Sequence, residues 1–215
     1  MITMLELSLM NATHLDTIRE IGNIGGGHAA TALSSLLGCQ VRVEIPKAEL
    51  VSIYELNNYY DDPDSAYAAV FSSSNHEDPF NFMLIVKESD VNKLIILLMY
   101  KQFKTKMDVS SMSQDMKDSA LGEIGNILLG SFLTAVNGFL GVSSGMAAPS
   151  MAHDTLSAIL SVVSAMFGEF GDVALVTRSN LIVGTGTGAN SIGANILLTS
   201  GPKALESLLV KLGVM

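Results

Sequence analysis

The sequence predicts a mixed α/β protein made of two pseudo-symmetric half-domains that share a largely antiparallel sheet. Three observations support this prediction: a long helical segment that occurs twice, strand-like segments after each copy, and enough apolar material for a large core. The chain has 215 residues, of which 48% are hydrophobic and only 15% are charged. This composition is the reverse of that of disordered chains and suffices for one large domain.

The repeated segment is the strongest signal in the sequence. Ile18–Gly38 reads IREIGNIGGGHAATALSSLLG, and Leu121–Gly141 reads LGEIGNILLGSFLTAVNGFLG. The copies align without gaps at an offset of 103 residues, and 11 of 31 aligned positions are identical. Because the offset is near half the chain length, we interpret the chain as a tandem duplication within one domain, with repeats over 1–103 and 104–215.

In the first half, the repeated helix is followed by a short mixed segment and then by regular elements. Ser65–Ser74 and Phe80–Ser89 are rich in β-branched and aromatic residues, which predicts strands. The apolar spacing over Asp90–Tyr100 predicts a helix. The polar stretch Lys101–Gln114 is expected to link the halves.

The second half repeats this order. An apolar helix is expected over His153–Phe167, strands over 172–184 and 192–200, and a last helix over Pro202–Leu212 that begins with proline. The glycine-rich run 184–189 formally fits a dinucleotide motif, but a strand-like segment follows it, so we interpret it as a hairpin loop. We therefore expect antiparallel hairpins, with the two long repeated helices exposed on one side of the sheet.

Composition excludes several classes of function. The chain has 12 basic and 21 acidic residues, for a net charge of -9, which argues against binding nucleic acid or an anionic membrane. One cysteine and four scattered histidines give no ligand spacing for a metal. The first residues lack the features of a signal peptide, and the apolar run Leu156–Phe167 is too short to span a bilayer. We expect a cytoplasmic protein that does not insert into membranes.

Each copy carries an acid or hydroxyl, a glutamate and an asparagine, separated by four and then three residues. These residues are Asp16, Glu20 and Asn23 in the first copy and Ser119, Glu123 and Asn126 in the second. Steps of four and three residues return to the same face of a helix. We therefore predict a polar ridge on each helix, flanked by apolar positions such as Ile21 and Ile24 that are expected to be buried.

The polar ridge and its glycines could each also have a purely structural explanation. A lone glutamate on a helix is most often a solvated residue, but here Glu and Asn recur together in the same register. Gly27 and Gly130 lie one turn after the asparagines, and a glycine inside a helix costs about 1 kcal/mol relative to alanine. They could let the backbone of a partner approach the ridge, or they could serve helix packing inside the protein; both readings remain open.

An exposed carboxylate beside a carboxamide is suited to few reactions. An asparagine is not a general base, but its amide oxygen can orient a water and its NH₂ can donate to a developing charge. A glutamate can fix a lysine or arginine of a partner. No serine lies in a GxSxG setting, and His28 is replaced by Ser131 in the second copy, so a repeated nucleophilic triad is not expected. The pair fits hydrolysis of a labile group held by another molecule, as in phosphoryl transfer.

These residues resemble the motif of the CheC/CheX/FliY family of chemotaxis phosphatases, [D/S]-x3-E-x2-N-x22-P. Both copies match it at full spacing, ending at Pro46 and Pro149. The resemblance covers the whole chain, and two motifs in a chain of this length are similar to the CheC branch.

The resemblance implies a substrate, a mechanism and partners. The substrate would be the aspartyl phosphate of a phosphorylated CheY-type response regulator. Asn23 and Asn126 would place the attacking water, while Glu20 and Glu123 would pair with the regulator's lysine. Further candidates for substrate binding are the first positions of the motif, Asp16 and Ser119, together with the ridge glycines Gly27 and Gly130. The chain would need no cofactor, since Mg²⁺ would belong to the regulator, and CheD is a further possible partner. The alternative is a non-catalytic adaptor that binds a regulator or CheD.

Overall fold

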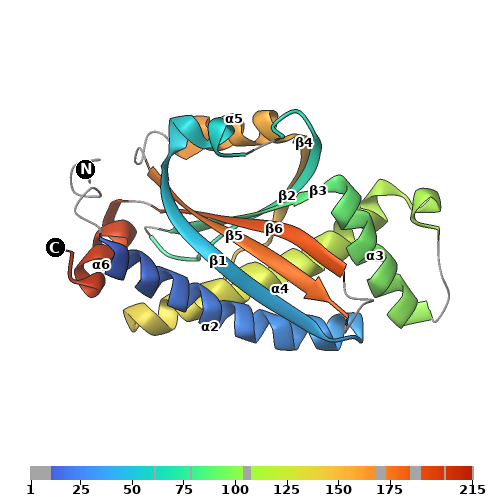
Figure 1. Cartoon of the computed structure of the whole chain (residues 1–215), viewed down its shortest axis with the longest axis horizontal. Helices are drawn as coiled ribbons and strands as arrows, with labels where there is room; N and C mark the ends of the chain where they lie inside the picture. The colour runs from blue at the N-terminus through green and yellow to red at the C-terminus, as the bar shows by residue number, and fades with distance from the viewer. Residues whose placement is uncertain are drawn as a thin grey trace.

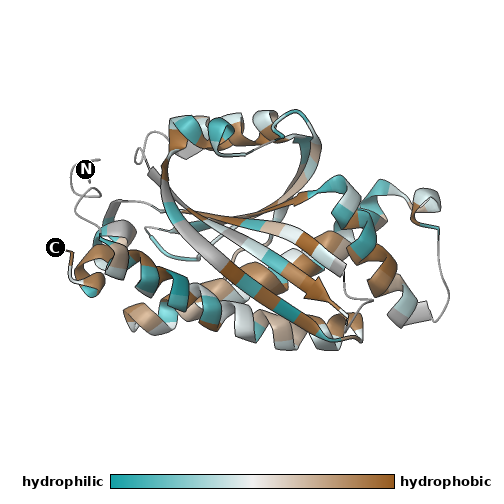
Figure 2. Ribbon diagram, in the orientation of Figure 1, coloured by the Kyte–Doolittle hydropathy of each residue, from teal (hydrophilic) through white to brown (hydrophobic). Residues whose placement is uncertain are grey.

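The repeated segment forms two long helices, α2 (Ala12–Leu37) and α4 (Gln114–Leu140), which lie against one face of the sheet (Figure 1). The computed structural model describes residues 11–60, 62–77, 79–103, 108–167, 173–184, 190–200 and 202–214. Figure 2 shows hydrophilic and hydrophobic residues mixed along α2, as expected for a helix with one buried and one exposed side.

The other elements follow each long helix in matching order. The first half continues with β1 (Val41–Ser52), the 3₁₀ helix η1 (Ile53–Tyr59), β2 (Ala66–Ser73), β3 (Phe80–Lys87) and α3 (Glu88–Phe103). The second half continues with β4 (Ser150–Thr155), α5 (Leu156–Phe167), β5 (Val173–Val183), β6 (Asn190–Ser200) and α6 (Pro202–Leu212). A short 3₁₀ helix, η2 (Val109–Ser111), precedes α4.

Strands from both halves make up the sheet, and each edge strand pairs with a strand of the other half. Within the described residues, six strands pair in the order β1-β5-β6-β3-β2-β4, and every pair is antiparallel. Exchanging the halves, so that β1, β2 and β3 trade places with β4, β5 and β6, reproduces the same order read backwards. The sheet therefore has pseudo-twofold topology about its central β3–β6 pair, and the predicted fold class is confirmed.

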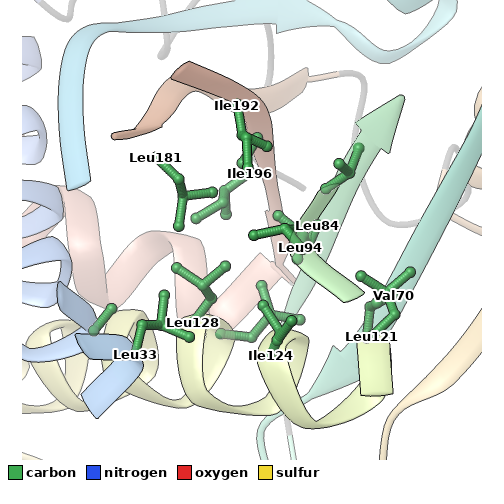
Figure 3. Close-up of a cluster of buried hydrophobic side chains, with 14 of the residues drawn as sticks. Leu33, Val70, Leu84, Leu94, Leu121, Ile124, Leu128, Leu181, Ile192 and Ile196 are labelled. Atoms are coloured by element: carbon green, nitrogen blue, oxygen red, sulfur yellow. The ribbon is translucent and has the colours of Figure 1, made fainter. Parts of the chain in front are cut away.

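The sheet has an apolar core on each face. Along β3, Phe82 and Leu84 belong to the cluster beneath α2, α3 and α4, whereas Met83 and Ile85 belong to the cluster beneath η1 and α5. This alternation is the two-residue period of a strand buried on both faces. In Figure 3, Leu128 of α4 lies among the side chains of the larger cluster, which draws on both long helices and the sheet.

Helix ends occur at equivalent positions in the two repeats. Gly38 and Gly141 end α2 and α4 with φ of 67° and 75°, the left-handed conformation that glycine adopts without a Cβ penalty. At the start, the side chain of Asn11 accepts a hydrogen bond from the His14 amide at 3.1 Å, and Ser113 caps α4 in the same manner. The sequence thus sets both ends of each long helix locally.

Two strands were not predicted. The helix expected over His153–Phe167 begins only at Leu156, because His153 lies in β4, which pairs along β2. β4 is a polar edge strand with mostly exposed side chains, so it lacks the apolar alternation that marks a strand. β1 is the opposite edge strand, and its pairing register shifts between Glu44 and Lys47, around Pro46. Bulges and sheet edges are where a strand tolerates a proline, which cannot donate to the ladder.

The apolar composition of α4 is explained by its position in the core. By length and composition this helix could cross a membrane, but 61% of its most apolar window is buried inside the structure. The loop predicted over 184–189 lies outside the described residues beyond Gly184. The strands on either side of it pair antiparallel, Val183 opposite Asn190, as a hairpin requires.

The glycines of the long helices fall into two groups. A Cβ added to Gly25 would lie 3.0 Å from Phe132 Cα and 3.2 Å from Ser131 O, so α2 and α4 meet almost backbone to backbone there. A Cβ on Gly125 would lie 2.7 Å from Val70 Cγ1 of β2. A Cβ added to Gly27, by contrast, would have no atom within 4 Å from other described parts of the structure. The helix-packing interpretation is therefore right for the buried glycines, which also include Gly22 and Gly26.

We predict that Gly125→Ala lowers stability by about 1–3 kcal/mol, because the new methyl overlaps a β-branched side chain fixed in the sheet. Gly130→Ala on the same helix is the matched control. Nothing lies within 4 Å of its added Cβ, so we expect unchanged or higher stability, by up to about 1 kcal/mol. Urea unfolding of both variants measures the difference, and equal stabilities would contradict this account of α4 packing.

Candidate functional site

The predicted ridge lies at the surface of both long helices. Glu20 and Asn23 are exposed on α2, and Glu123 and Asn126 are exposed on α4. The residues that come between them point inward, as shown by Ile124, which is 0% exposed. The buried stripe of each helix therefore fixes the direction of its polar ridge.

These four side chains have no partner within the described part of the chain. Neither a hydrogen bond nor an ion pair joins Glu20, Asn23, Glu123 or Asn126 to another described residue. The first motif position of the first copy differs from these four residues, because the Asp16 carboxylate forms an ion pair with Arg19 at 3.1 Å. Two carboxylates and two carboxamides are thus presented to solvent with their hydrogen-bonding capacity unused.

The two ridges are separate but close. The helices run antiparallel in Figure 1, and Gly25 lies opposite Phe132. Beyond that contact, Asn126 shares the lining of one groove with His28 and Ala32 of α2. The second motif therefore lies beside the part of α2 that follows the first motif.

A groove borders the second site. It has a volume of about 590 Å³ and takes its lining from α4, from α2 and from the segment that follows α4. Asn126 lies in its lining, with Gly130 one turn later and Met146 on the far side. A second groove, of about 620 Å³, lies between the end of α4 and α6 and contains no motif residue. Of these two grooves, the one at Asn126 is therefore the one that borders a motif residue.

The ridge glycines form the second, open group. Apart from their own helix, no heavy atom of the described residues lies within 4 Å of a Cβ added to Gly27 or Gly130. They leave a low surface one turn after each asparagine, which is the surface that a docking backbone would need. Their predicted role in substrate contact stays a prediction.

The start of α4 is tied to two neighbouring elements. His153 of β4 contacts Glu88 of α3 through Nδ1 at 2.5 Å and Asp118 of α4 through Nε2 at 2.9 Å. Asp118 directly precedes the motif residue Ser119. The contact holds the first turns of α4 against the sheet edge and so positions the second ridge.

Two residues near the sites were not predicted to be accessible or functional. Ile24, expected to be buried, is 49% exposed beside Asn23, because the next inward positions of α2 are glycines that lie against β1 and α4. His28 lies in the lining of the groove at Asn126, across the helix interface. Its place beside Asn126 could not be predicted from local pattern, because the groove joins residues almost one hundred positions apart.

No group of three His, Cys, Asp or Glu in the described ranges is arranged to hold a metal ion. The chemistry that the site can perform with its own residues is donation and acceptance of hydrogen bonds and pairing with a cation. The expectation that this chain needs no metal stays a prediction.

Comparison with known proteins agrees with this arrangement. The model of the CheC-like family matches twice, over residues 14–49 and 116–151. CheY-P phosphatase CheC of Bacillus subtilis (strain 168) is 28% identical over 200 residues, which is 93% of each chain.

Solved structures share the fold. FliY of Thermotoga maritima superposes with a TM-score of 0.72 at 18% identity, covering 95% of this chain and 98% of that one. A chain of the FliM–SpeE complex from H. pylori gives 0.67 at 14% identity, covering 95% and 96%. Fold and repeated motif together define a duplicated α/β protein that carries one motif-bearing helix in each half. Both motif segments match the CheC-like family, to which the chain is similar, as the resemblance of the motifs predicted.

We predict that alanine at Glu20, Asn23, Glu123 or Asn126 leaves the free energy of unfolding unchanged or raises it by up to about 0.7 kcal/mol, since alanine is the better helix former. Ile124→Ala is the control from the buried side of the same turn and should lose about 2–5 kcal/mol. Chemical denaturation measures both. Destabilisation by any ridge variant comparable to that of Ile124→Ala would mean that the ridge is structural.

Proposed function

We propose that this protein is a cytoplasmic phosphatase that hydrolyses the aspartyl phosphate of a CheY-type response regulator. One observation carries the proposal: exposed, unpartnered Glu–Asn pairs occur at the same register on both long helices. The similarity to CheY-P phosphatase CheC supports the choice of substrate. Interaction with CheD stays a prediction from the family resemblance.

In this proposal each asparagine places the attacking water. The regulator holds the phosphoryl group and its Mg²⁺, so the phosphatase need only supply geometry and hydrogen bonds. The carboxamide oxygen of Asn23 or Asn126 accepts from the water and directs it in line with the phosphorus, while the NH₂ can donate to charge that develops in the transition state. Such positioning is the main catalytic contribution available in phosphoryl transfer.

Each glutamate fixes the docked regulator. Glu20 and Glu123 lie three residues before the asparagines on the same helix face, about 5–6 Å away between Cβ atoms. A lysine of the regulator that pairs with this carboxylate would set the depth and angle at which the asparagine enters. Because neither carboxylate has an internal partner among the described residues, no contact within the chain has to break first.

We predict that Asn23→Ala combined with Asn126→Ala slows the assisted decay of phosphorylated regulator about a hundredfold, because the water is no longer positioned. Each single variant should keep partial activity from its intact site. The measurement is loss of phosphoryl label from the regulator over time. A double variant as fast as the wild type would disprove the water-positioning role, and a wild type that binds without acceleration would favour an adaptor.

We predict that Glu20→Lys combined with Glu123→Lys weakens binding of the regulator at least tenfold, because each new ammonium faces the regulator's lysine. Glu206→Lys, at an exposed position of α6 outside both motifs, changes the net charge in the same direction by the same amount as either single Glu→Lys variant, and it controls for the effect of net charge. Titration of the regulator by fluorescence or calorimetry compares the variants. Unchanged affinity in the double variant would rule out lysine pairing.

A further inference from the structure

The groove at the second site is built from both repeats. Its lining joins Asn126 of α4 with His28 and Ala32 of α2. The close contact of the helices at Gly25 brings these residues of α2 beside the second motif. The second site is therefore composite, and the contribution of α2 can be tested separately from the motif itself.

The imidazole of His28 is available to bind a ligand. Its side chain is exposed, and within the described residues it makes no hydrogen bond and no ion pair. An imidazole carries at least one N–H donor in either protonation state. It therefore adds to the groove a donor that the Glu–Asn motif does not supply.

The other side-chain hydroxyls of the described lining are already engaged. Ser131 Oγ donates to Ile127 O at 2.7 Å, and Thr134 Oγ1 donates to Gly130 O at 2.8 Å, each within α4. Ser144 Oγ donates to Asn137 Oδ1 at 3.0 Å. Among the lining residues, His28 and Asn126 are left as the side-chain donors that face the groove without an internal acceptor.

An anionic group entering this groove would meet few other donors. The chain has a net charge of -9, and neither Lys nor Arg is part of the groove lining. A phosphoryl group presents three oxygens, of which a water-positioning asparagine can serve only some. We propose that His28 donates a hydrogen bond to a phosphoryl oxygen of the regulator bound at Asn126; this inference rests on the proposed function.

The two sites are then chemically different. At the first site, the position equivalent to His28 is Ser131, 103 residues later. Its hydroxyl is half-buried and donates to its own helix, so it cannot replace the imidazole. Hydrolysis at the second site depends on His28, whereas hydrolysis at the first does not.

The test uses backgrounds that leave one site each. Asn23→Ala leaves the second site, and Asn126→Ala leaves the first. We expect His28→Ala to slow decay of phosphorylated regulator about tenfold in the Asn23→Ala background, the size of a hydrogen bond to a charged group. In the Asn126→Ala background its effect should stay within about twofold. His28→Gln, which restores an N–H donor, should recover most of the loss at the second site.

Controls distinguish failure of the His28 inference from failure of the proposed function. Thr31→Ala changes an exposed residue of the same helix whose hydroxyl donates only to Gly27 O, and it should leave both backgrounds unchanged. Equal loss from His28→Ala in both backgrounds, or no recovery with glutamine, would show a structural role and overturn the inference. The inference would also be overturned if His28→Ala lost no activity in either background while the double asparagine variant was inactive. If that double variant stays active, the proposed function itself fails.

Discussion

The approach of α2 to α4 at Gly25 is the contact on which both sites depend. A single methyl there would press on the backbone of Ser131 and Phe132, so the helices are as close as their main chains allow. At a wider separation, His28 and Ala32 would move away from the groove that borders Asn126. The glycine is thus needed for packing, and through packing it determines which residues can serve the second site.

The sheet holds that contact in place because neither half completes it alone. Each edge strand pairs with a strand of the other half: β1 with β5, and β4 with β2. The central β3–β6 pair also joins the halves. Each long helix packs on a sheet built from both repeats. Because the order of the strands is pseudo-twofold, the two helices occupy equivalent positions on that sheet. The chain can therefore present the same motif twice with the same buried side facing inward.

Local pattern predicted much of this fold. The two long helices, the apolar strands β2 and β3 and the helix that starts at Pro202 all carry signals within a few residues of sequence. The edge strand β4 was missed because its side chains are mostly exposed and its stability comes from pairing with the distant strand β2. β1 does alternate between apolar and polar residues over Val41–Ile45, but Pro46 interrupts that pattern, and the strand continues beyond it by pairing with β5. The motif residues were named from spacing alone, and their exposure fits that assignment, but their roles stay predictions.

The sequence alone could not distinguish the glycines that pack inside the protein from those that leave the ridge open. Gly25 and Gly26 become Leu128 and Leu129 in the second copy, which are 1% and 0% exposed. This difference is tolerated because a close helix interface needs complementary volumes, so a notch on α2 can accept the bulkier surface of α4.

The polar ridge is subject to no such internal compensation. Glu20 and Asn23 touch no described residue that would require them, and the same holds for Glu123 and Asn126. A buried position can change when its neighbour changes, whereas an exposed position that matches in both repeats without an internal partner has no structural reason to match. In the proposed function, the constraint on these side chains comes from a molecule outside the chain. A partner that carries both a cation and an acceptor for a positioned water satisfies the carboxylate and the carboxamide together.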